Sequence, residues 1–481
     1  MITRTFLDKS TTIIKDTTYN YGLHPISMLN YGTLLSRIVL HFDIEELRKR
    51  IDDRTYYDIS KLTHTLKMKN CGSIQPEKHK QKLTSSDIKG IKERATSFTL
   101  IAFEVPQAWD EGVGFDNAND FWLVGKSATS QDGCTWYNAT NEETWGEEGI
   151  YSTETLLEEY ELYKQGKNSI IIATQHFDHG NENLELDLTE YINNKLLESG
   201  SSNNGICIAF APELEEMDMK YTQYVGFFNN KTNTIFHPVL ESRYDCDICD
   251  DRLSFALNKE NKIYLYSFIG GALENLDEMP TCKIEGSPCN GFDGEMELPV
   301  VQESKGIYSA SLKLSTPDFH KDMVFYDTWG NLSYQGDVID DVELDFATHA
   351  PQIYFSVSDK VIEPKVLNPM LIGINNNEKV NRGEERMLKV FFRIPYTNSD
   401  FKLCDHCWYR IYAKDGDREI TIVDWDKLLK MHSHNFFMIK TNEFVPTEYH
   451  IDIKAKFGDE VRIFKNQLTF KIVSNPTEQD M

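Results

Sequence analysis

The sequence has no long apolar run and no familiar catalytic signature. Nowhere in its 481 residues do apolar side chains approach the roughly 18 in succession that a membrane-spanning helix needs. The opening residues, MITRTFLDKSTTIIKD, show neither the apolar segment nor the cleavage site of a secretory signal. The motifs of phosphate-binding loops, serine hydrolases, zinc proteases and EF-hands are absent as well. We therefore expect a soluble protein of a reducing cytoplasm that is not an enzyme.

Positive charge and cysteine are also scarce. The 50 basic residues face 76 acidic ones, and the formal net charge is −26. A chain with this charge repels phosphate backbones and anionic lipids, so we expect no membrane partner and no specific nucleic-acid binding. Nine cysteines, an odd number in a long chain, do not describe a disulfide framework.

Short apolar or alternating runs separated by turn residues fill most of the chain. This spacing predicts β-sandwiches rather than alternating strands and helices, so the expected fold class is mainly β, with tandem β-sandwiches and a few short helices. Two Gly-containing turns between alternating runs, Asp415-Gly416 and Gly458-Asp459, predict hairpins. The clearest strand candidates are residues 36–42, 97–105, 169–177, 205–211, 262–269 and 307–314.

Three stretches have helical character: 43–53, 152–166 and 188–200. The first begins with Asp43 as a candidate N-cap. The second contains the capping-box pattern Thr155-x-x-Glu158, although Ser152 is another candidate cap one turn earlier. The third has Thr189 as its candidate cap, and the last two stretches stop at glycines.

Two changes of composition divide the chain into three expected domains. The acidic, apolar-poor stretch ESRYDCDICDDR, residues 241–252, ends the first domain, and Pro351 restarts an extended run after the second. The expected domains are then 1–242, a large β-sandwich with helical insertions, 253–346, an Ig-like sandwich, and 351–475, a C-terminal sandwich.

The first domain contains a series of phrases in a family-typical order. They are TTIIKDTTYNYG (11–22), LLSRIVLHFDIEEL (34–47), TWYNATNEETWGEEGIYS (135–152), LELDLTEYINNKL (184–196), NNGICIAF (203–210) and YVGFFNNKTNTIFHPVLESRYD (224–245). This series resembles the DNRLRE-type, jelly-roll-like β-sandwich of secreted carbohydrate-active proteins and of bacteriophage virion proteins. The insertion at 54–83 and the helix at 152–166 depart from the family pattern, and we interpret both as contact elements for neighbouring subunits. The later domains resemble, in style, structural proteins of crAss-like tailed phages.

Trp136 and Trp145 stand in a polar stretch, DGCTWYNATNEETWGEEG, that offers little to build a helix or a core. In the domains that this region resembles, such a loop closes one end of the sandwich, and both indoles would cap the core. The alternative is an exposed pair that stacks against sugar rings. No nucleophile and base accompany the tryptophans, so a catalytic role is the least favoured of the three.

The cysteines offer a candidate metal site. Structural zinc needs four Cys or His ligands, often supplied as Cys-x-x-Cys pairs. Two such pairs could share one ion, or the first pair could combine with the two cysteines of the second domain; reduced, partly buried thiols remain the simpler interpretation. The loop histidines of His176-x-x-His179 and of His432-x-His434, which follows a short helix expected near 425–431, are weaker candidates. The cysteines concerned are Cys246, Cys249, Cys282, Cys289, Cys404 and Cys407.

Together the composition and the resemblance imply a structural component of a tailed-phage virion, assembled in the host cytoplasm. The expected place is the neck, ring, collar or tail hub, with copies of the chain forming a ring that contacts portal, neck and tail proteins. The alternative is a carbohydrate-binding or receptor-binding fibre or adhesin. No cofactor is expected apart from the zinc considered above.

Overall fold

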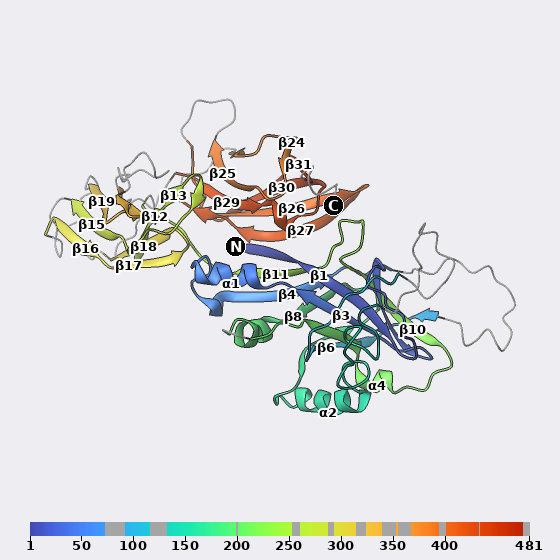
Figure 1. Cartoon of the computed structure of the whole chain (residues 1–481). Helices are drawn as coiled ribbons and strands as arrows, with labels where there is room; N and C mark the ends of the chain where they lie inside the picture. The colour runs from blue at the N-terminus through green and yellow to red at the C-terminus, as the bar shows by residue number, and fades with distance from the viewer. Residues whose placement is uncertain are drawn as a thin grey trace. The chain divides into compact units, whose positions relative to one another are not determined.

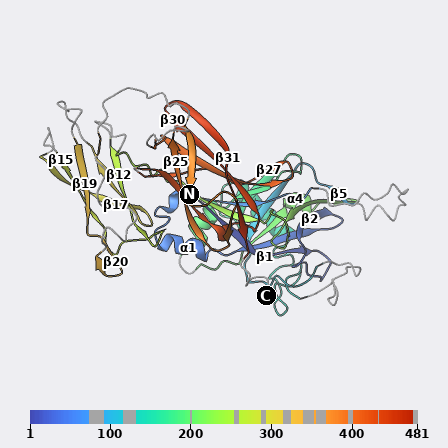
Figure 2. The same ribbon diagram turned by 90° about the horizontal axis from the view of Figure 1, so that it is seen from above.

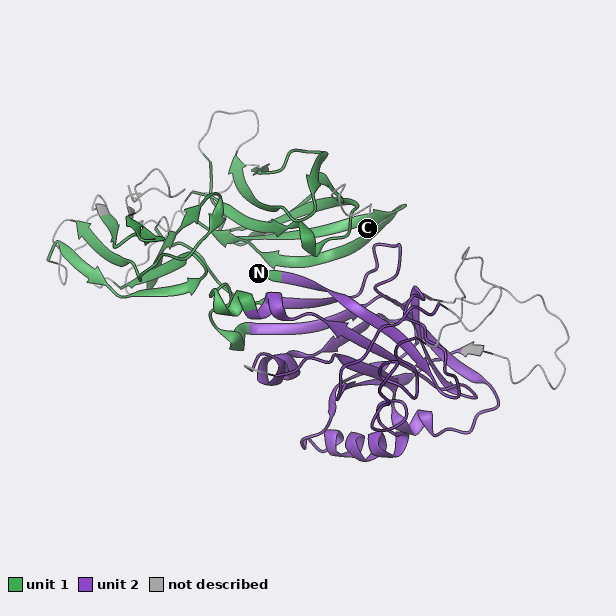
Figure 3. Ribbon diagram, in the orientation of Figure 1, with its two compact units in different colours: residues 1–2, 49–61, 244–481 green, residues 3–48, 62–243 purple. Residues whose placement is uncertain are grey.

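The computed structural model confirms that the protein is mainly β (Figure 1). The chain divides into two compact units, coloured separately in Figure 3. Unit 1 comprises residues 1–2, 49–61 and 244–481, and unit 2 comprises residues 3–48 and 62–243. The structure describes residues 1–72, 92–115, 132–198, 201–252, 260–286, 293–313, 324–338, 353–354, 367–393, 401–431 and 433–474.

Unit 2 is built on one 11-stranded sheet that branches at strand β3. This strand pairs with β1, β2 and β9, and β9 also pairs with β6, which continues to β7. The main path of the sheet runs β5 (Lys92–Arg94), β10 (Thr222–Phe228), β2 (Ile26–Gly32), β3 (Ser36–Phe42), β1 (Ile2–Ile14), β11 (Val239–Tyr244), β4 (Leu62–Met68) and β8 (Leu184–Asp187); the branch consists of β9 (Ile206–Phe210), β6 (Phe98–Glu104) and β7 (Ile171–Phe177).

The main core of unit 2 covers one face of the branch. Antiparallel register aligns Val39, Cys207 and Phe103 in one row across β3, β9 and β6. All three side chains are fully buried, and they contact helix α2 (Thr153–Lys164) through Leu156 and the two tryptophans of loop 132–152 in the same cluster. The period-2 alternation that predicted these strands therefore also selects the residues of this core.

Two of the expected helices form as predicted and the third does not. Helix α1 (Glu45–Asp52) follows Asp43, whose carboxylate accepts a hydrogen bond from the Glu45 amide. The cap of α2 is Ser152, whose hydroxyl oxygen accepts from the Thr155 amide, so the capping box that begins at Thr155 is wrong. The third stretch forms α3 (Thr189–Tyr191) and continues as a π-turn (Ile192–Leu196), and the expected cap Thr189 instead accepts at its hydroxyl from the His64 amide of β4.

The first part of unit 1 is a small sandwich (Figure 2). A three-stranded sheet packs with a four-stranded sheet around a core that includes Tyr308, Ile284 and Trp329. Strand β22 (Ile353–Tyr354) pairs with β19, so this sandwich extends beyond the predicted end at 346. The sheets are β12 (Asn261–Tyr266), β18 (Ile307–Leu312) and β17 (Val300–Ser304), and β16 (Glu295–Leu298), β15 (Thr281–Gly286), β19 (Val324–Gly330) and β22.

A second sandwich completes unit 1. Tyr409 stacks on Phe437 from the opposite sheet, with ring centroids 4.0 Å apart. Both predicted hairpins form, at Gly416 and Gly458, whose positive φ angles of 59° and 58° suit glycine. The short helix expected before His432 is wrong, because strands occupy that stretch. The sheets are β23 (Asn368–Ile372), β25 (Glu385–Arg393), β29 (Asn435–Lys440) and β28 (Leu429–Lys430), and β24 (Glu378–Asn381), β31 (Glu460–Val473), β30 (Glu448–Phe457), β26 (His406–Asp415) and β27 (Arg418–Lys427).

The two sandwiches of unit 1 share a core, so the second and third expected domains form one compact unit. Tyr266 and Phe268 of the first sandwich pack on Phe436 of the second, together with Ile248. The stretch 241–252 is therefore not a bare linker: its first residues end β11 and its last ones enter this core. The second expected boundary, 347–352, lies outside the described residues.

Most of the described part of the 54–83 insertion is built into the fold. Residues 54–61 belong to unit 1, where Tyr56 is buried and the Ser304 hydroxyl donates to the Thr55 carbonyl. Strand β4 pairs with β8 inside the sheet of unit 2. The described part of the insertion is therefore packed within the fold, its role as a contact element for neighbouring subunits stays a prediction, and residues 73–83 lie outside the described residues.

Candidate functional site

A buried arginine on β3 is the centre of the candidate site in unit 2. Arg37 is the one basic side chain in the strand SRIVLHF, and it is fully buried. Its guanidinium forms a bidentate pair with Glu215 at the end of α4 (Pro212–Glu215), with Nε–Oε1 and Nη2–Oε2 distances of 3.0 and 2.5 Å. Neither side chain of this pair is exposed to solvent. Burial acts to lower the pKa of Arg37, but the attraction of Glu215 outweighs it, and the net pKa lies above its ordinary value.

The remaining donors of Arg37 hold the loop that carries the two tryptophans. Nη1 donates to the carbonyls of Gly149 and Tyr151 at 2.7 and 2.6 Å. The guanidinium also lies 5.0 Å from the centroid of the Trp136 ring, within cation–π range. A charge that would be costly to bury alone is thus paired and hydrogen-bonded, and it fixes the backbone of the loop.

The loop is packed tightly around Trp136. Trp136 and Trp145 are 3% and 5% exposed, and the Trp145 indole donates to the Thr135 carbonyl at 2.9 Å. Gly149 has a φ of 72°, and a Cβ there would lie 2.6 Å from the Trp136 ring. The burial agrees with the interpretation that both indoles cap the core, and it removes the open ring face that the sugar-stacking interpretation requires.

Unit 1 contains a second buried charge network. Arg252 forms ion pairs with Asp250 and Asp327, and its Nη2 also donates to the Tyr264 carbonyl at 2.9 Å. Asp327 in turn accepts from the Trp329 indole at 2.8 Å. Burial raises the pKa of Asp250 to about 6, against the opposing effect of Arg252. Every interaction of this network stays inside the fold, so it stabilises the sandwich and offers no open group for chemistry.

The predicted zinc site shared by two Cys-x-x-Cys pairs is not assembled. Cys249 lies beside Lys430 on β28, whereas Cys407 is buried within the second sandwich next to Cys404. Within the described part of the chain, no three His, Cys, Asp or Glu side chains converge in a way that could hold a metal ion. Cys289 lies outside the described residues, so the alternative set that includes it remains a prediction.

The described cysteines are free thiols in protein surroundings. Burial raises the pKa of Cys246 and of Cys249, and it raises that of Cys282 to about 12. For Cys407, burial and the neighbouring Cys404 thiol raise the pKa well above its usual value. Zinc binds the thiolate, so these environments favour the protonated form that does not bind metal.

Among the histidines that the structure describes, none joins a group of side chains that could hold a metal ion. His176 contacts the Thr99 hydroxyl and lies 3.6 Å from Asp178, and both of these ionisable side chains are more than half exposed. His434 is buried against Phe391, while His432 lies outside the described residues.

The buried anchors were missed by pattern reasoning, although the sequence carries a signal for them. A lone arginine inside an apolar strand, as at position 37, predicts a buried ion pair. Its partner Glu215 lies 178 positions away, and nothing local marks it. The acidic stretch before Arg252 was interpreted as a linker because its polar residues hide the buried Ile248 and Asp250.

No family model and no curated protein matches the chain. Solved structures match only weakly. A chimeric titin Z1Z2 tandem covers 46% of this chain and 92% of its own length at 9% identity and a TM-score of 0.14. The Yersinia pseudotuberculosis adhesin InvE covers 44% and 54% at 10% identity and a TM-score of 0.15, and a DUF4785 family protein of Legionella pneumophila covers 85% and 88% at 8% identity and a TM-score of 0.17. Scores this low support no argument about function.

Within the described ranges, no helix has both the length and the apolar character needed to cross a membrane.

Proposed function

We propose that the chain is a non-enzymatic structural component of a tailed-phage virion, placed at the neck, ring, collar or tail hub. Copies of the chain form a closed ring that contacts portal, neck and tail proteins, and DNA passes through the ring or fibres attach to it. The DNRLRE-like phrases of the first domain and the tandem sandwiches support this assignment.

The observation that carries the proposal is that the buried charged side chains pair with one another inside the fold. In unit 2 the Arg37–Glu215 pair serves to hold a loop, and in unit 1 Arg252 is paired with both Asp250 and Asp327 in the core. A site for chemistry needs at least one such group to face a substrate. Buried pairs that fix loops and sheets are instead what a structural scaffold requires, because the pairs set one geometry for the units that assemble.

Quantitative mass spectrometry of purified particles tests this proposal. The chain is expected in particles at a fixed small copy number relative to the major capsid protein, as a closed ring requires. A host cytoplasmic protein of similar abundance in the lysate serves as the control for contamination. Loss of the chain in parallel with that host protein during purification would overturn the proposal.

A receptor-binding fibre or adhesin remains the alternative function. Its original support, a sugar-stacking role for Trp136 and Trp145, is weakened by the burial of both indoles. The two functions differ in where the chain sits on the particle, and labelling of intact particles separates them.

A further inference from the structure

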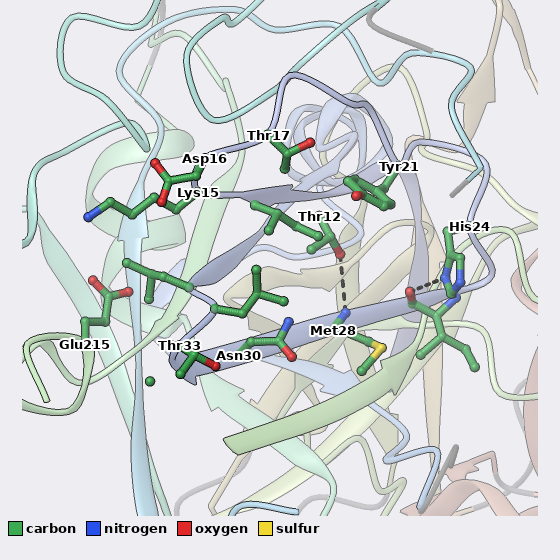
Figure 4. Close-up of a pocket in the computed structure, with 15 residues that line it drawn as sticks. Thr12, Lys15, Asp16, Thr17, Tyr21, His24, Met28, Asn30, Thr33 and Glu215 are labelled. Carbon is green, nitrogen blue, oxygen red and sulfur yellow. Dashed lines mark hydrogen bonds between the residues drawn. The ribbon is translucent and has the colours of Figure 1, made fainter. Parts of the chain in front are cut away.

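Unit 2 has a pocket of ≈ 590 Å³ beside the Arg37–Glu215 pair. Figure 4 shows Lys15, Asp16 and Glu215 towards one end of the pocket and Tyr21 and His24 towards the other. The volume falls in the range of about 300–1,000 Å³ that small-molecule sites occupy. It is lined by residues 12, 14–17, 21, 24, 26, 28, 30, 32–35 and 215.

The framework of the pocket is held in place by the fold. Met28 and Asn30 lie two residues apart on β2 and so share one face of that strand. The Met28 amide donates to the Thr12 hydroxyl of β1 at 3.3 Å, and the Thr33 and Thr222 hydroxyls are 2.7 Å apart. Glu215 is fixed by its bidentate pair with Arg37. The pocket is therefore largely preformed, which lowers the entropic cost of binding.

The charges around the pocket nearly cancel. Glu215 is neutralised by Arg37, and the ammonium of Lys15 and the carboxylate of Asp16 offset each other at the rim. Neither Lys15 nor Asp16 has a side-chain hydrogen bond or ion pair within the described residues. A pocket without net charge has little preference for phosphates or for organic cations.

The remaining wall combines hydroxyl groups with apolar surface. Thr12, Thr17 and Thr33 supply hydroxyls, while Met28 and the Tyr21 ring supply apolar area. Among the described residues Thr12 and Thr17 only accept, from the Met28 and Tyr19 amides, so a lipid would leave their O–H donors without acceptors, which is unfavourable. A sugar matches both features, since its hydroxyls bond to short polar side chains and its C–H faces pack on rings and methyl groups.

A buried acceptor in the wall adds to this match. The Ser36 hydroxyl donates to the Met28 carbonyl at 2.8 Å, so it can only accept from the Asn30 amide nitrogen, 2.7 Å away. That assignment leaves Asn30 Oδ1 covered by protein and without a donor among the described residues. An acceptor in this state costs about 1–3 kcal/mol. Met28, its flexible neighbour on the same face, can move aside and let a ligand hydroxyl reach it.

We infer that this pocket binds a neutral saccharide of one or two rings. The inference goes beyond the virion proposal and does not depend on it: a scaffold and an adhesin could both carry such a site. The saccharide inference and the virion proposal can fail independently. Sugar binding is measured on the purified chain, whereas the place in the virion is tested on particles.

The test is saturation-transfer difference NMR of the full chain with glucose, galactose, mannose, N-acetylglucosamine, maltose and lactose, with glycerol as the background polyol. At least one sugar is expected to give signals well above glycerol. Met28→Trp fills the pocket and should weaken binding by at least about tenfold, or about 1.4 kcal/mol. Met279→Trp, at a site in unit 1 that is 44% exposed, is the matched control and should bind as the parent does.

Two further variants keep the test decisive. Thr17→Arg changes a partly exposed residue that lines the pocket, so it should block the pocket even if Met28→Trp lowers the unfolding temperature. Lys15→Met should change the affinity by less than about threefold, because a neutral sugar does not need the ammonium. Loss of sugar binding in Lys15→Met would mean that the site depends on the ammonium charge and would overturn the inference.

The inference is also overturned if no sugar exceeds glycerol, or if both pocket-filling variants bind as the parent does. If a sugar does bind, a glycan array with linked oligosaccharides distinguishes a cell-surface glycan from a small soluble saccharide as the natural ligand. Binding to linked glycans assigns the site to cell-surface glycans, and binding to free sugars alone assigns it to a small soluble saccharide.

Discussion

Each unit buries an arginine, but the two arginines differ in the number of their carboxylate partners. In unit 2, Arg37 has one carboxylate partner, Glu215, and its other donors bond to the backbone of loop 132–152. In unit 1, Arg252 has two carboxylate partners, Asp250 and Asp327. With one acid the charges balance and the spare donors fix a loop. With two acids one negative charge is in excess, and burial of that excess is why the pKa of Asp250 rises to about 6.

The units also differ in a second buried ionisable group. His64 of β4 is fully buried in unit 2, where Nδ1 contacts the Ser242 hydroxyl and Nε2 contacts the Asn193 amide oxygen. Burial lowers the pKa of His64 to about 4. Unit 2 therefore holds a base that resists protonation, and unit 1 holds an acid that resists ionisation. Acidification should act on the two units in opposite directions.

The largest effect is expected from breaking the balanced pair. Arg37→Met leaves Glu215 buried without its partner and should lower the free energy of unfolding by about 4 kcal/mol. Hydrogen–deuterium exchange should rise most in loop 132–152, whose carbonyls lose their donors. The double variant Arg37→Met/Glu215→Leu removes both charges and should recover part of the loss. Equal loss in the single and double variants would mean that the pair contributes packing alone.

The pH dependence sharpens the contrast between the units. Between pH 4 and 6.5 the unfolded chain protonates His64 more readily than the folded chain does, so this group makes stability rise with pH. Between pH 4 and 6 the folded chain holds the Asp250 proton more firmly than the unfolded chain does, so that group makes stability fall with pH. Each contribution amounts to about 3 kcal/mol across its window.

Calorimetry of two variants checks these signs. Relative to the parent, His64→Gln should be more stable at pH 4.5 than at pH 6.5, and Asp250→Asn should show the reverse. The comparison at two pH values removes any constant cost of each substitution. The same sign of change in both variants would contradict the contrast.

A smaller effect tests the packing of the loop that Arg37 holds. Gly149→Ala places a methyl group 2.6 Å from the Trp136 ring at a φ of 72°, and should cost about 2 kcal/mol. Gly146→Ala in the same loop is the control, because its Cβ would have no neighbour within 4 Å. Thermal unfolding should separate the two variants clearly. A shift of similar size in both would show that the loop is not tightly packed on Trp136.

The smallest effect concerns the start of α2, next to that loop. The Ser152 hydroxyl oxygen accepts from the Thr155 amide at 3.1 Å, so Ser152→Ala should cost about 1 kcal/mol. Glu158→Ala should cost almost nothing, because Glu158 would matter only if the helix began at Thr155. Circular dichroism during thermal unfolding measures both. A larger loss of stability from Glu158→Ala than from Ser152→Ala would mean that the helix begins with the capping box at Thr155.

Local patterns predicted the local parts of the fold. Residues 36–42 form β3 as predicted, and the Asp415-Gly416 turn joins β26 to β27, because alternation and turn chemistry depend on near neighbours. Thr189, the expected cap of the stretch 188–200, instead accepts from the His64 amide, 125 positions away. A local stretch of sequence cannot predict such a bond, because the partner lies far away along the chain.

The candidate site was harder to predict than the fold. The position of Trp136 and Trp145 in the core followed from their size and from the family resemblance, but their anchor Arg37 did not. The pocket draws its wall from the end of β1, from β2 and from α4, which lie up to about 200 positions apart in the sequence. No motif marks such a set, since it mixes threonines and aliphatic residues with scattered charged, aromatic and amide side chains.

Gold labelling of intact particles, with an antibody against the whole chain, tests the central claim most directly. Electron microscopy should show label clustered at the single tail vertex, as expected for a ring or hub. Particles lacking the chain serve as the control. Label at fibre tips would contradict the scaffold and favour the adhesin, and particles without label would contradict a place in the virion altogether.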